Sequence, residues 1–375
     1  MDKTIHKTWF KFILVLIFLY LFLVSIGLMG AAFKGFGKNF AENLLKTTAN
    51  PFVGLFIGIL ATSLVQSSST TTSILVGMVA SGVLTISNTV PIIMGANIGT
   101  TVTNTLVSLG HITRREEFKR AIAGATIHDF FNLICVTIMF PLELMFGFLE
   151  KSATILSKLF INCGGIKFTS PLKIVTEPTI KFIRNIFTEL LHLPKIFASI
   201  LILVTAMLLL FLALYYIVKL MKSLVSNKTE TVLINIIGRK GIIGIFVGLA
   251  FTAMVQSSSI TTSLLIPLIS AEILTIELAF PITMGANIGT TTTAMLASFA
   301  TGNSAAITIA FVHFLFNLIG VSCIYPIKIF RKIPIYFARQ LGELAFKKRW
   351  YAFAYVLGFF FLLPGIFVIL LKILK

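Results

Sequence analysis

The sequence predicts an all-α polytopic membrane protein built from two inverted-topology repeats, each with a re-entrant helical hairpin and a discontinuous helix. Three observations lead to this class. Hydrophobic residues make up 57% of the 375 residues, charged residues only 12%, and the mean hydropathy is +0.99. A polar motif occurs twice, and the apolar stretches that contain it are interrupted near their middles. A soluble domain of this length does not have this composition.

The duplicated motif defines the repeats. Its copies are Gln66–Ser69 with Met94–Thr101, and Gln256–Ser259 with Met284–Thr291, offset by 190 residues. Within an ungapped alignment that begins at Gly54, 26 of 48 positions are identical, and the matches concentrate at polar residues and glycines. A second echo, offset by 185, pairs His128 and Asn132 with His313 and Asn317. We interpret this as an internal duplication under a chemical constraint.

The apolar runs divide the chain into six parts. They are an N-terminal span and link (1–49), repeat 1 (50–148), an extramembrane linker (149–195), a span and cytoplasmic link (196–240), repeat 2 (241–327), and a surface amphipathic helix with a C-terminal span (328–375). In each repeat the first stretch, 51–80 or 241–270, carries serines at its centre and predicts a re-entrant hairpin. The second, 83–109 or 274–300, has two glycines and an Asn at mid-membrane, which predicts a broken helix.

The number of crossings predicts that the repeats are inverted. Three full spans, 83–109, 120–148 and 197–221, separate Gln66 from Gln256, and an odd number of crossings reverses the second copy. Inverted repeats with broken helices and a site at the midplane are typical of secondary transporters. The predicted topology places the 110–120 turn in the cytoplasm and the linker outside, although the linker carries seven Lys or Arg.

The net charge of +18 points to lipid rather than to nucleic acid. The basic residues cluster at the ends of apolar runs, which is the positive-inside pattern, and anionic lipid is the expected partner. Cys135 and Cys323 lie in apolar segments and Cys163 is alone in the linker, so no disulfide framework or metal motif is predicted. No GxSxG or HExxH motif supports a hydrolase, and we expect a protein that is not an enzyme.

The repeated motifs supply hydroxyls, amides and exposed backbone with almost no fixed charge. Free N–H groups at helix N-termini and Ser hydroxyls suit an oxyanion, whereas Gln and Thr oxygens suit a hard cation such as sodium. Two opposite ions bound together relieve each other's desolvation cost, which favours co-transport. The alternative is that these small residues only pack helices closely. Their repetition at one spacing argues against packing alone.

Asp129 is the most informative single residue, because an ionisable group within a span is costly and marks a functional site by default. Its duplicate position is Phe314, so the symmetry breaks by one charge. A simpler alternative is that Asp129 pairs with His128 or with a helix end. The His residues could likewise form core pairs with the Asn four positions later, one helical turn away.

Together these motifs resemble the type II sodium/phosphate cotransporters. The resemblance rests on both serine motifs, both GANIGTT segments and the run Arg120–Asn132, and it covers roughly residues 50–148 and 240–327. It implies an elevator-like inverted-repeat fold and coupled inward movement of sodium and inorganic phosphate. The Ala123, Ala125 and Asp129 arrangement resembles that of the electrogenic members, which take an additional sodium. The compact linker favours a prokaryotic-type member.

The resemblance also implies roles for individual residues. The phosphate-binding candidates are Ser67, Ser68, Ser69, Asn97, Ser257, Ser258, Ser259 and Asn287. The sodium candidates are Gln66, Thr100, Thr103, Asp129, Gln256, Thr290 and Thr293. Sodium is then a co-substrate, and no further cofactor is expected.

We therefore predict a multi-pass protein of the plasma membrane that couples sodium entry to phosphate uptake by alternating access. The alternatives are transport of another oxyanion such as sulfate or arsenate, phosphate export, a passive anion channel, or a membrane scaffold that does not transport. The oligomeric state stays open, with a homodimer as one possibility.

Overall fold

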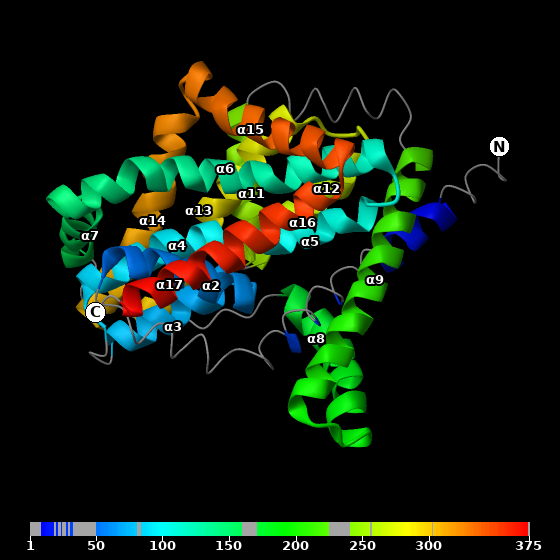
Figure 1. Cartoon of the computed structure of the whole chain (residues 1–375), viewed down its shortest axis with the longest axis horizontal. Coiled ribbons are helices and arrows are strands. Elements are labelled where there is room, and N and C mark those ends of the chain that lie inside the picture. The colour runs from blue at the N-terminus through cyan, green and yellow to red at the C-terminus, as the bar shows by residue number, and fades with distance from the viewer. Residues whose placement is uncertain are drawn as a thin grey trace.

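The protein is helical throughout the part of the chain that the structure describes (Figure 1). This computed structural model describes residues 9–18, 20, 21, 24, 28, 31, 32, 50–80, 84–159, 171–224, 241–255, 257–301 and 303–373. The predicted all-α class is confirmed for these residues. Gln256, most of the N-terminal link, the middle of the linker and the cytoplasmic link 225–240 lie outside them.

Each predicted hairpin consists of two short helices that are separated by two residues in the sequence. In repeat 1 these are α2 (Pro51–Val65) and α3 (Ser68–Ala80), and in repeat 2 they are α11 (Gly241–Val255) and α12 (Ser258–Ser270). Helices of 15 and 13 residues are about 22 and 20 Å long, shorter than the ~30 Å hydrocarbon core of a bilayer. Their length agrees with the predicted re-entrant hairpins, although entry from one side of a membrane stays a prediction.

The first helix of each hairpin packs backbone to backbone against the helix that carries GANIGTT. That helix is α4 (Ile86–Gly99) in repeat 1 and α13 (Ile276–Thr301) in repeat 2. A Cβ added at Gly95 would collide with the Leu55 carbonyl of α2, and one added at Gly285 would collide with the Ile245 carbonyl of α11. Only glycine permits so close an approach.

The prediction of two discontinuous helices is wrong for repeat 2 and agrees with the structure in repeat 1. In repeat 2, α13 runs unbroken through Gly285 and Asn287. In repeat 1, α4 ends at Gly99, the second of the two glycines at which the break was predicted, and Thr100–Thr101 separates it from α5 (Val102–Ser108). Gly95 and Gly285 serve close helix packing instead of unwinding the chain, since a hydrogen-bonded backbone is more stable than a broken one in an apolar interior.

The second hairpin helix of each repeat packs against the other repeat. Helix α3 contacts α13 and α14 (Ser304–Ile324), while α12 contacts α5 and α6 (Arg115–Phe146). Thr262 and Ser263 of α12 both donate hydrogen bonds to Asn104 Oδ1 of α5, at 2.9 and 3.0 Å. Each repeat therefore packs its second hairpin helix against equivalent helices of the other repeat.

Four segments among the described residues are long and apolar enough to cross a membrane. They are Ile86–His111, Arg115–Phe146, Ser304–Ile324 and Trp350–Leu371. The first includes the short 3₁₀ helix η1 (Leu109–His111), and the last combines α16 (Trp350–Leu357), the π-helical turn η3 (Gly358–Leu362) and α17 (Leu363–Ile373). Length and composition thus support an integral membrane protein.

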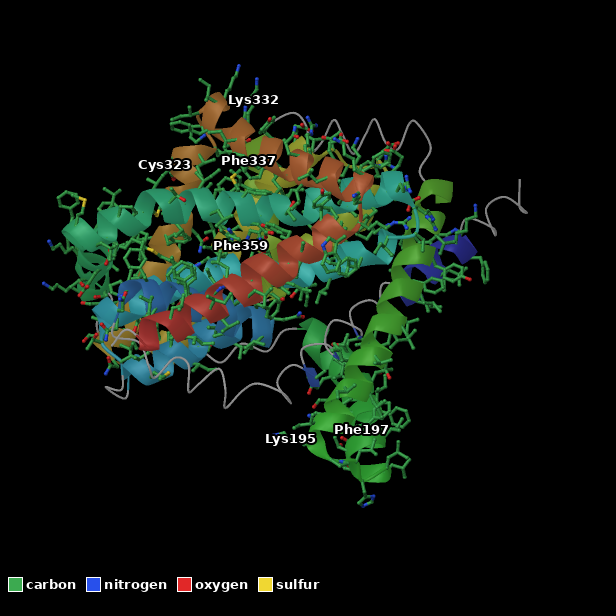
Figure 2. The ribbon with its side chains drawn as sticks, viewed as in Figure 1. Lys195, Phe197, Cys323, Lys332, Phe337 and Phe359 are labelled. Carbon is green, nitrogen blue, oxygen red and sulfur yellow. The ribbon has the colours of Figure 1, made fainter. Side chains whose placement is uncertain are left out.

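The remaining helices lie around the repeats. The predicted linker contains α7 (Phe148–Leu159), α8 (Pro171–Asn185) and the π-helical turn η2 (Ile186–Leu190), which leads towards α9 (Lys195–Leu224). Helices α8 and α9 extend away from the main bundle (Figure 1), and Lys195 and Phe197 lie at the projecting end (Figure 2). The predicted amphipathic segment forms α15 (Lys328–Lys347), which packs along α6.

Candidate functional site

The first serine of each motif caps a helix. Gln66 adopts the left-handed conformation at φ 53° and ends α2, and Ser67 Oγ then accepts a hydrogen bond from Thr70 N at 3.1 Å. In repeat 2, Ser257 Oγ accepts from Ile260 N at 3.4 Å. A serine is favoured at this position because its side chain satisfies one of the free N–H groups of the first turn.

The serines that follow lie on the first turns of α3 and α12. Ser68, Ser258 and Ser259 are buried, and Ser69 is half-buried. The first turn of a helix exposes N–H groups and the positive end of its dipole, which together suit an anion. Ser67 and Ser257 organise these two N-termini, while the other four hydroxyls lie on them.

The four threonines among the predicted sodium ligands differ in whether their hydroxyls form a hydrogen bond within the protein. Thr100 and Thr290 donate hydrogen bonds to carbonyls one turn earlier on their own helices, at 2.9 and 3.0 Å. The hydroxyls of Thr103 and Thr293 are buried and have no partner among the described residues. These two positions are equivalent, 190 residues apart. Because a buried hydroxyl without a partner is costly, Thr103 and Thr293 are the hydroxyls best placed to coordinate an ion.

The two predicted Asn residues belong to a buried polar cluster that joins the repeats. Asn287 Nδ2 donates to Asn132 Oδ1 at 2.9 Å, and Asn317 Nδ2 donates to Asn97 Oδ1 at 3.1 Å. Asn132 also donates to the Asn97 carbonyl at 2.9 Å. All four side chains are at most 5% exposed, so these bonds lie in a low-dielectric interior where they are strong.

Sequence reasoning did not place Asn132 and Asn317 at the site. One alternative was that each pairs with the His one turn earlier, but Asn317 donates to the His313 backbone carbonyl at 3.0 Å, and the His128 ring bonds Asn287 of the other repeat. The echo of His and Asn at one spacing was the available signal. Among the described residues, no hydrogen bond joins either serine motif directly to this cluster.

Asp129 is fully buried on α6 and does not pair with His128. Tyr355 of α16 donates to Asp129 Oδ2 at 2.9 Å, and the Thr101 side chain also interacts with the carboxylate, whereas Oδ1 accepts no hydrogen bond of good geometry in the described part of the chain. Tyr355 comes from the C-terminal span and was not predicted, because one tyrosine in an apolar helix carries no distinctive signal. A buried carboxylate with one open oxygen is a suitable ligand for a cation.

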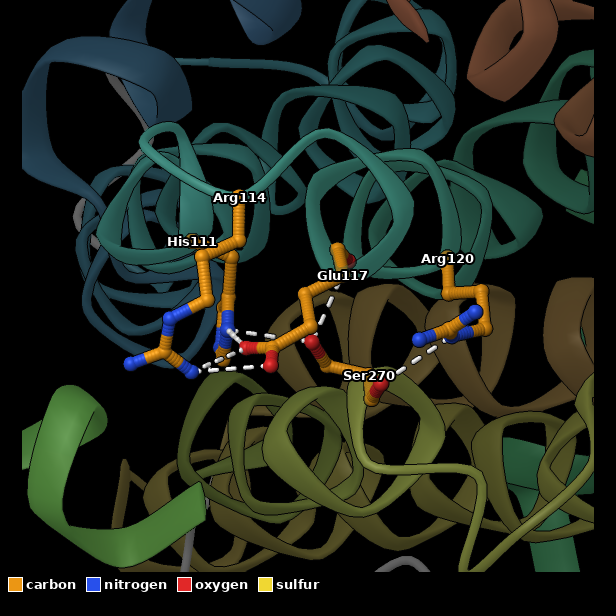
Figure 3. A network of polar contacts seen from close by, with 5 residues as sticks. All are labelled: His111, Arg114, Glu117, Arg120 and Ser270. Atoms are coloured by element: carbon orange, nitrogen blue, oxygen red, sulfur yellow. Dashed lines mark hydrogen bonds and ion pairs between the residues drawn. The ribbon is translucent and has the colours of Figure 1, made fainter. Parts of the chain in front are cut away.

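The base of the second hairpin is fixed by polar contacts to the start of α6 (Figure 3). Arg114 Nη1 donates to both Glu117 carboxylate oxygens, at 2.8 and 2.7 Å, and Ser270 Oγ donates to the Glu117 carbonyl at 3.1 Å. Arg120 Nε donates to the Ser270 carbonyl at 3.0 Å, and its guanidinium lies 2.7 Å from Glu272. The hairpin base is therefore held by side-chain and backbone bonds together.

Two further ion pairs complete a ring around a cavity of about 450 Å³. Arg339 of α15 pairs with Glu277 of α13, and Lys119 of α6 pairs with Glu343 of α15. The Arg120–Glu272 pair joins α6 to the base of the second hairpin. One ion pair therefore links α6 to the second hairpin base, one links the start of α13 to α15, and one links α15 to α6. We call these three pairs the ion-pair ring.

Helices of membrane length, apolar enough to cross a bilayer, and the absence of strands among the described residues define an all-helical integral membrane protein. The chain belongs to the Na+/Pi-cotransporter family, whose model matches residues 21–169 and 208–339. This family is named for cotransport and not for a catalysed reaction.

Two sets of relatives extend this finding. The chain is 35% identical to "Sodium-dependent phosphate transport protein 2B" of Homo sapiens, over 94% of this chain and 64% of that protein. It is 36% identical to "Sodium-dependent phosphate transport protein 2A" of Ovis aries, over 96% of this chain and 67% of that protein. The chain thus spans about two thirds of the length of the curated relatives it matches. No solved structure matches it.

Proposed function

We propose that the protein is a secondary active symporter of the plasma membrane that couples sodium entry to uptake of inorganic phosphate. The observation that carries this proposal is the pair of serine-capped helix N-termini, at Ser67 and Ser257, in a chain whose relatives are named for sodium-dependent phosphate transport. Hydroxyl and N–H donors at two such N-termini can surround the oxygens of one phosphate.

Sodium binding is assigned to oxygens that no protein donor occupies. Thr103 and Thr293 supply one equivalent hydroxyl from each repeat, and Asp129 supplies the open carboxylate oxygen. Gln66, Thr100 and Thr290 complete the assigned set in the described residues, and Gln256 completes it in the sequence. Sodium and phosphate bound together lower the cost of burying either charge, which links their movements.

Transport proceeds by alternating access in inverted repeats, with net charge movement through Asp129. The lone carboxylate, opposite Phe314 in the second repeat, supports a third, asymmetric cation position. When the bound sodium ions carry more positive charge than the phosphate carries negative charge, each transport cycle moves net positive charge inward. The membrane potential then contributes to the driving force.

The test is uptake of radiolabelled phosphate into proteoliposomes with and without an imposed sodium gradient. We expect uptake to require the gradient and to rise with an inside-negative potential. Equal uptake in both conditions would support a passive channel and refute symport. Competition by sulfate or arsenate, measured in the same vesicles, determines which oxyanion the site prefers.

A further inference from the structure

The buried cluster between the repeats is chemically symmetric but not symmetrically bonded. His128 and Asn132 on α6 bond to Asn287 on α13. Their equivalents in the sequence are His313 and Asn317 on α14, of which Asn317 bonds to Asn97 on α4. If the two repeats were arranged symmetrically, each hydrogen bond on one side of the cluster would have an equivalent on the other side. We call the α6–α13 side the first half of the cluster and the α4–α14 side the second half.

In the first half both His128 and Asn132 bond to Asn287 of the other repeat, while the other ring nitrogen of His128, Nδ1, has no partner among the described residues. His128 Nε2 donates to Asn287 Oδ1, and Asn287 Nδ2 donates to Asn132 Oδ1 at 2.9 Å. Asn287 is thus held between two side chains of α6. This closes α13 of repeat 2 onto α6 of repeat 1.

The second half is bonded differently. Asn97 Nδ2 turns back to the Ile93 carbonyl of its own helix at 2.8 Å, and Asn97 Oδ1 accepts from Asn317 instead of from His313. His313 is fully buried, yet neither of its ring nitrogens has a partner among the described residues. Asn317 Oδ1 is also without a partner there. His313 Nε2 and Asn317 Oδ1 are the counterparts of the atoms that hold Asn287 in the first half, and they form no hydrogen bond among the described residues.

We propose that His128 and His313 are alternating positioning residues, each of which clamps the Asn of the opposite repeat in one of the two end states of transport. In the state described, His128 holds Asn287 and His313 is released. In the other state His313 donates to Asn97 Oδ1, Asn97 Nδ2 donates to Asn317 Oδ1, and His128 is released. This inference rests on the proposed alternating-access transport.

The physical basis is an exchange between equivalent repeats. When one repeat moves against the other around a fixed site, each repeat takes up the arrangement that its counterpart had before. Because the exchange forms the same bonds that it breaks, the two end states stay close in free energy, and small ligand effects can shift their populations. An unbonded buried imidazole is tolerated in one state because it is bonded in the other.

The experiment compares the two His residues directly. His128→Phe and His313→Phe keep an aromatic ring and remove the bonding nitrogens. Each is placed in a background in which Cys135, Cys163 and Cys323 are changed to Ser, together with one reporter, Thr70→Cys in the first hairpin or the equivalent Ile260→Cys in the second. Labelling by a membrane-impermeant thiol reagent, applied to one face of sealed proteoliposomes, reports which state is populated.

We expect the two substitutions to change the labelling rate of a given reporter in opposite directions, each by about fivefold, the scale of one net hydrogen bond. His128→Gln and His313→Gln, which keep an amide donor, should return the rate towards that of the parent protein. Where a Phe variant does not fold, the Ala variant provides the same comparison. Shifts in one direction for both residues, or no shift in either, would overturn the proposal.

Phosphate uptake by the parent protein is measured in the same vesicles. Uptake that does not depend on sodium refutes the symport itself. Sodium-driven uptake without opposite labelling shifts refutes only the alternation of the two His residues.

Discussion

The two hairpins have the same interior and different attachments. Their helices have the same lengths, both are capped by the first serine of the motif, and both lie on the GANIGTT helix through glycines. At their bases, however, repeat 2 has Ser270, Glu272 and Glu277, where repeat 1 has Ala80, Gly82 and Ser87. The serine motif and the glycine contacts are the same in both copies, whereas the residues that attach each hairpin to its surroundings differ.

Glu272 shows the cost of that attachment. It adopts a positive φ of 62°, a conformation that favours glycine, and the equivalent residue in repeat 1 is Gly82. Such a backbone costs on the order of 1 kcal/mol in a residue with a side chain. The ion pair with Arg120 at 2.7 Å, and through it the ion-pair ring, explains why a glutamate occupies this position. Ion pairs thus connect the base of the second hairpin and the adjoining start of α13 to two helices outside the hairpin, α6 and α15.

The largest expected effect is on the shared interior. Gly95→Ala and Gly285→Ala should each destabilise the protein by about 3 kcal/mol or more, because a methyl group would force two helix backbones apart. Gly358→Ala and Gly365→Ala, where the added carbon meets open space, serve as controls and should be neutral or slightly stabilising. Thermal unfolding in detergent measures both. Tolerance of one interior substitution but not of its equivalent would show that the two interiors are not alike.

The next effect concerns the charge present in one repeat only. Asp129→Gly should leave some phosphate uptake but abolish its response to membrane potential, since one charge moved across the field amounts to about 2.3 kcal/mol per 100 mV. Tyr355→Phe, which removes the hydrogen bond to this carboxylate but keeps the charge, is the control and should retain the response. Current recordings or uptake under imposed potentials provide the measurement. A voltage response that survives Asp129→Gly would remove this residue from the coupling.

A smaller effect is expected at the equivalent threonines. Thr103→Val and Thr293→Val keep the side-chain shape and remove the unpartnered hydroxyl, so each should raise the sodium concentration for half-maximal uptake by about tenfold, the scale of one polar contact to an ion. Half-saturating phosphate at high sodium should change much less. If only one of the pair affects sodium dependence, the two half-sites are functionally unequal despite their matching sequences.

The smallest effect tests the strained turn. Glu272→Gly loses the ion pair but relieves the backbone, so its stability should stay within about 1 kcal/mol of the parent protein. Glu272→Gln loses the charge and keeps the strain, and should be the less stable of the two by about 1 kcal/mol. Thermal unfolding at low salt separates them. The reverse order would mean that the backbone at this position carries no strain.

The sequence was sufficient for features that depend on local chemistry. Apolar runs of membrane length predicted the helical class. The serines at the centre of 51–80 predicted that this stretch is divided there, and the structure ends α2 at Gln66 with Ser67 capping α3. The break expected at Gly285 was wrong, since a glycine in an apolar run can unwind a helix or admit a second helix, and only the partner decides. Likewise, the bond from His128 to Asn287 joins residues 159 apart, which no local spacing reveals.

The glycine contacts between α2 and α4, and between α11 and α13, also determine which parts can move. With carbonyls seated against Cα atoms, neither helix can slide along its partner unless the two first separate. Each pair therefore behaves as one rigid body, and any displacement during a transport cycle is confined to the surfaces where larger side chains meet. In hydrogen exchange, the amides along these two seams should be the last in the protein to become deuterated.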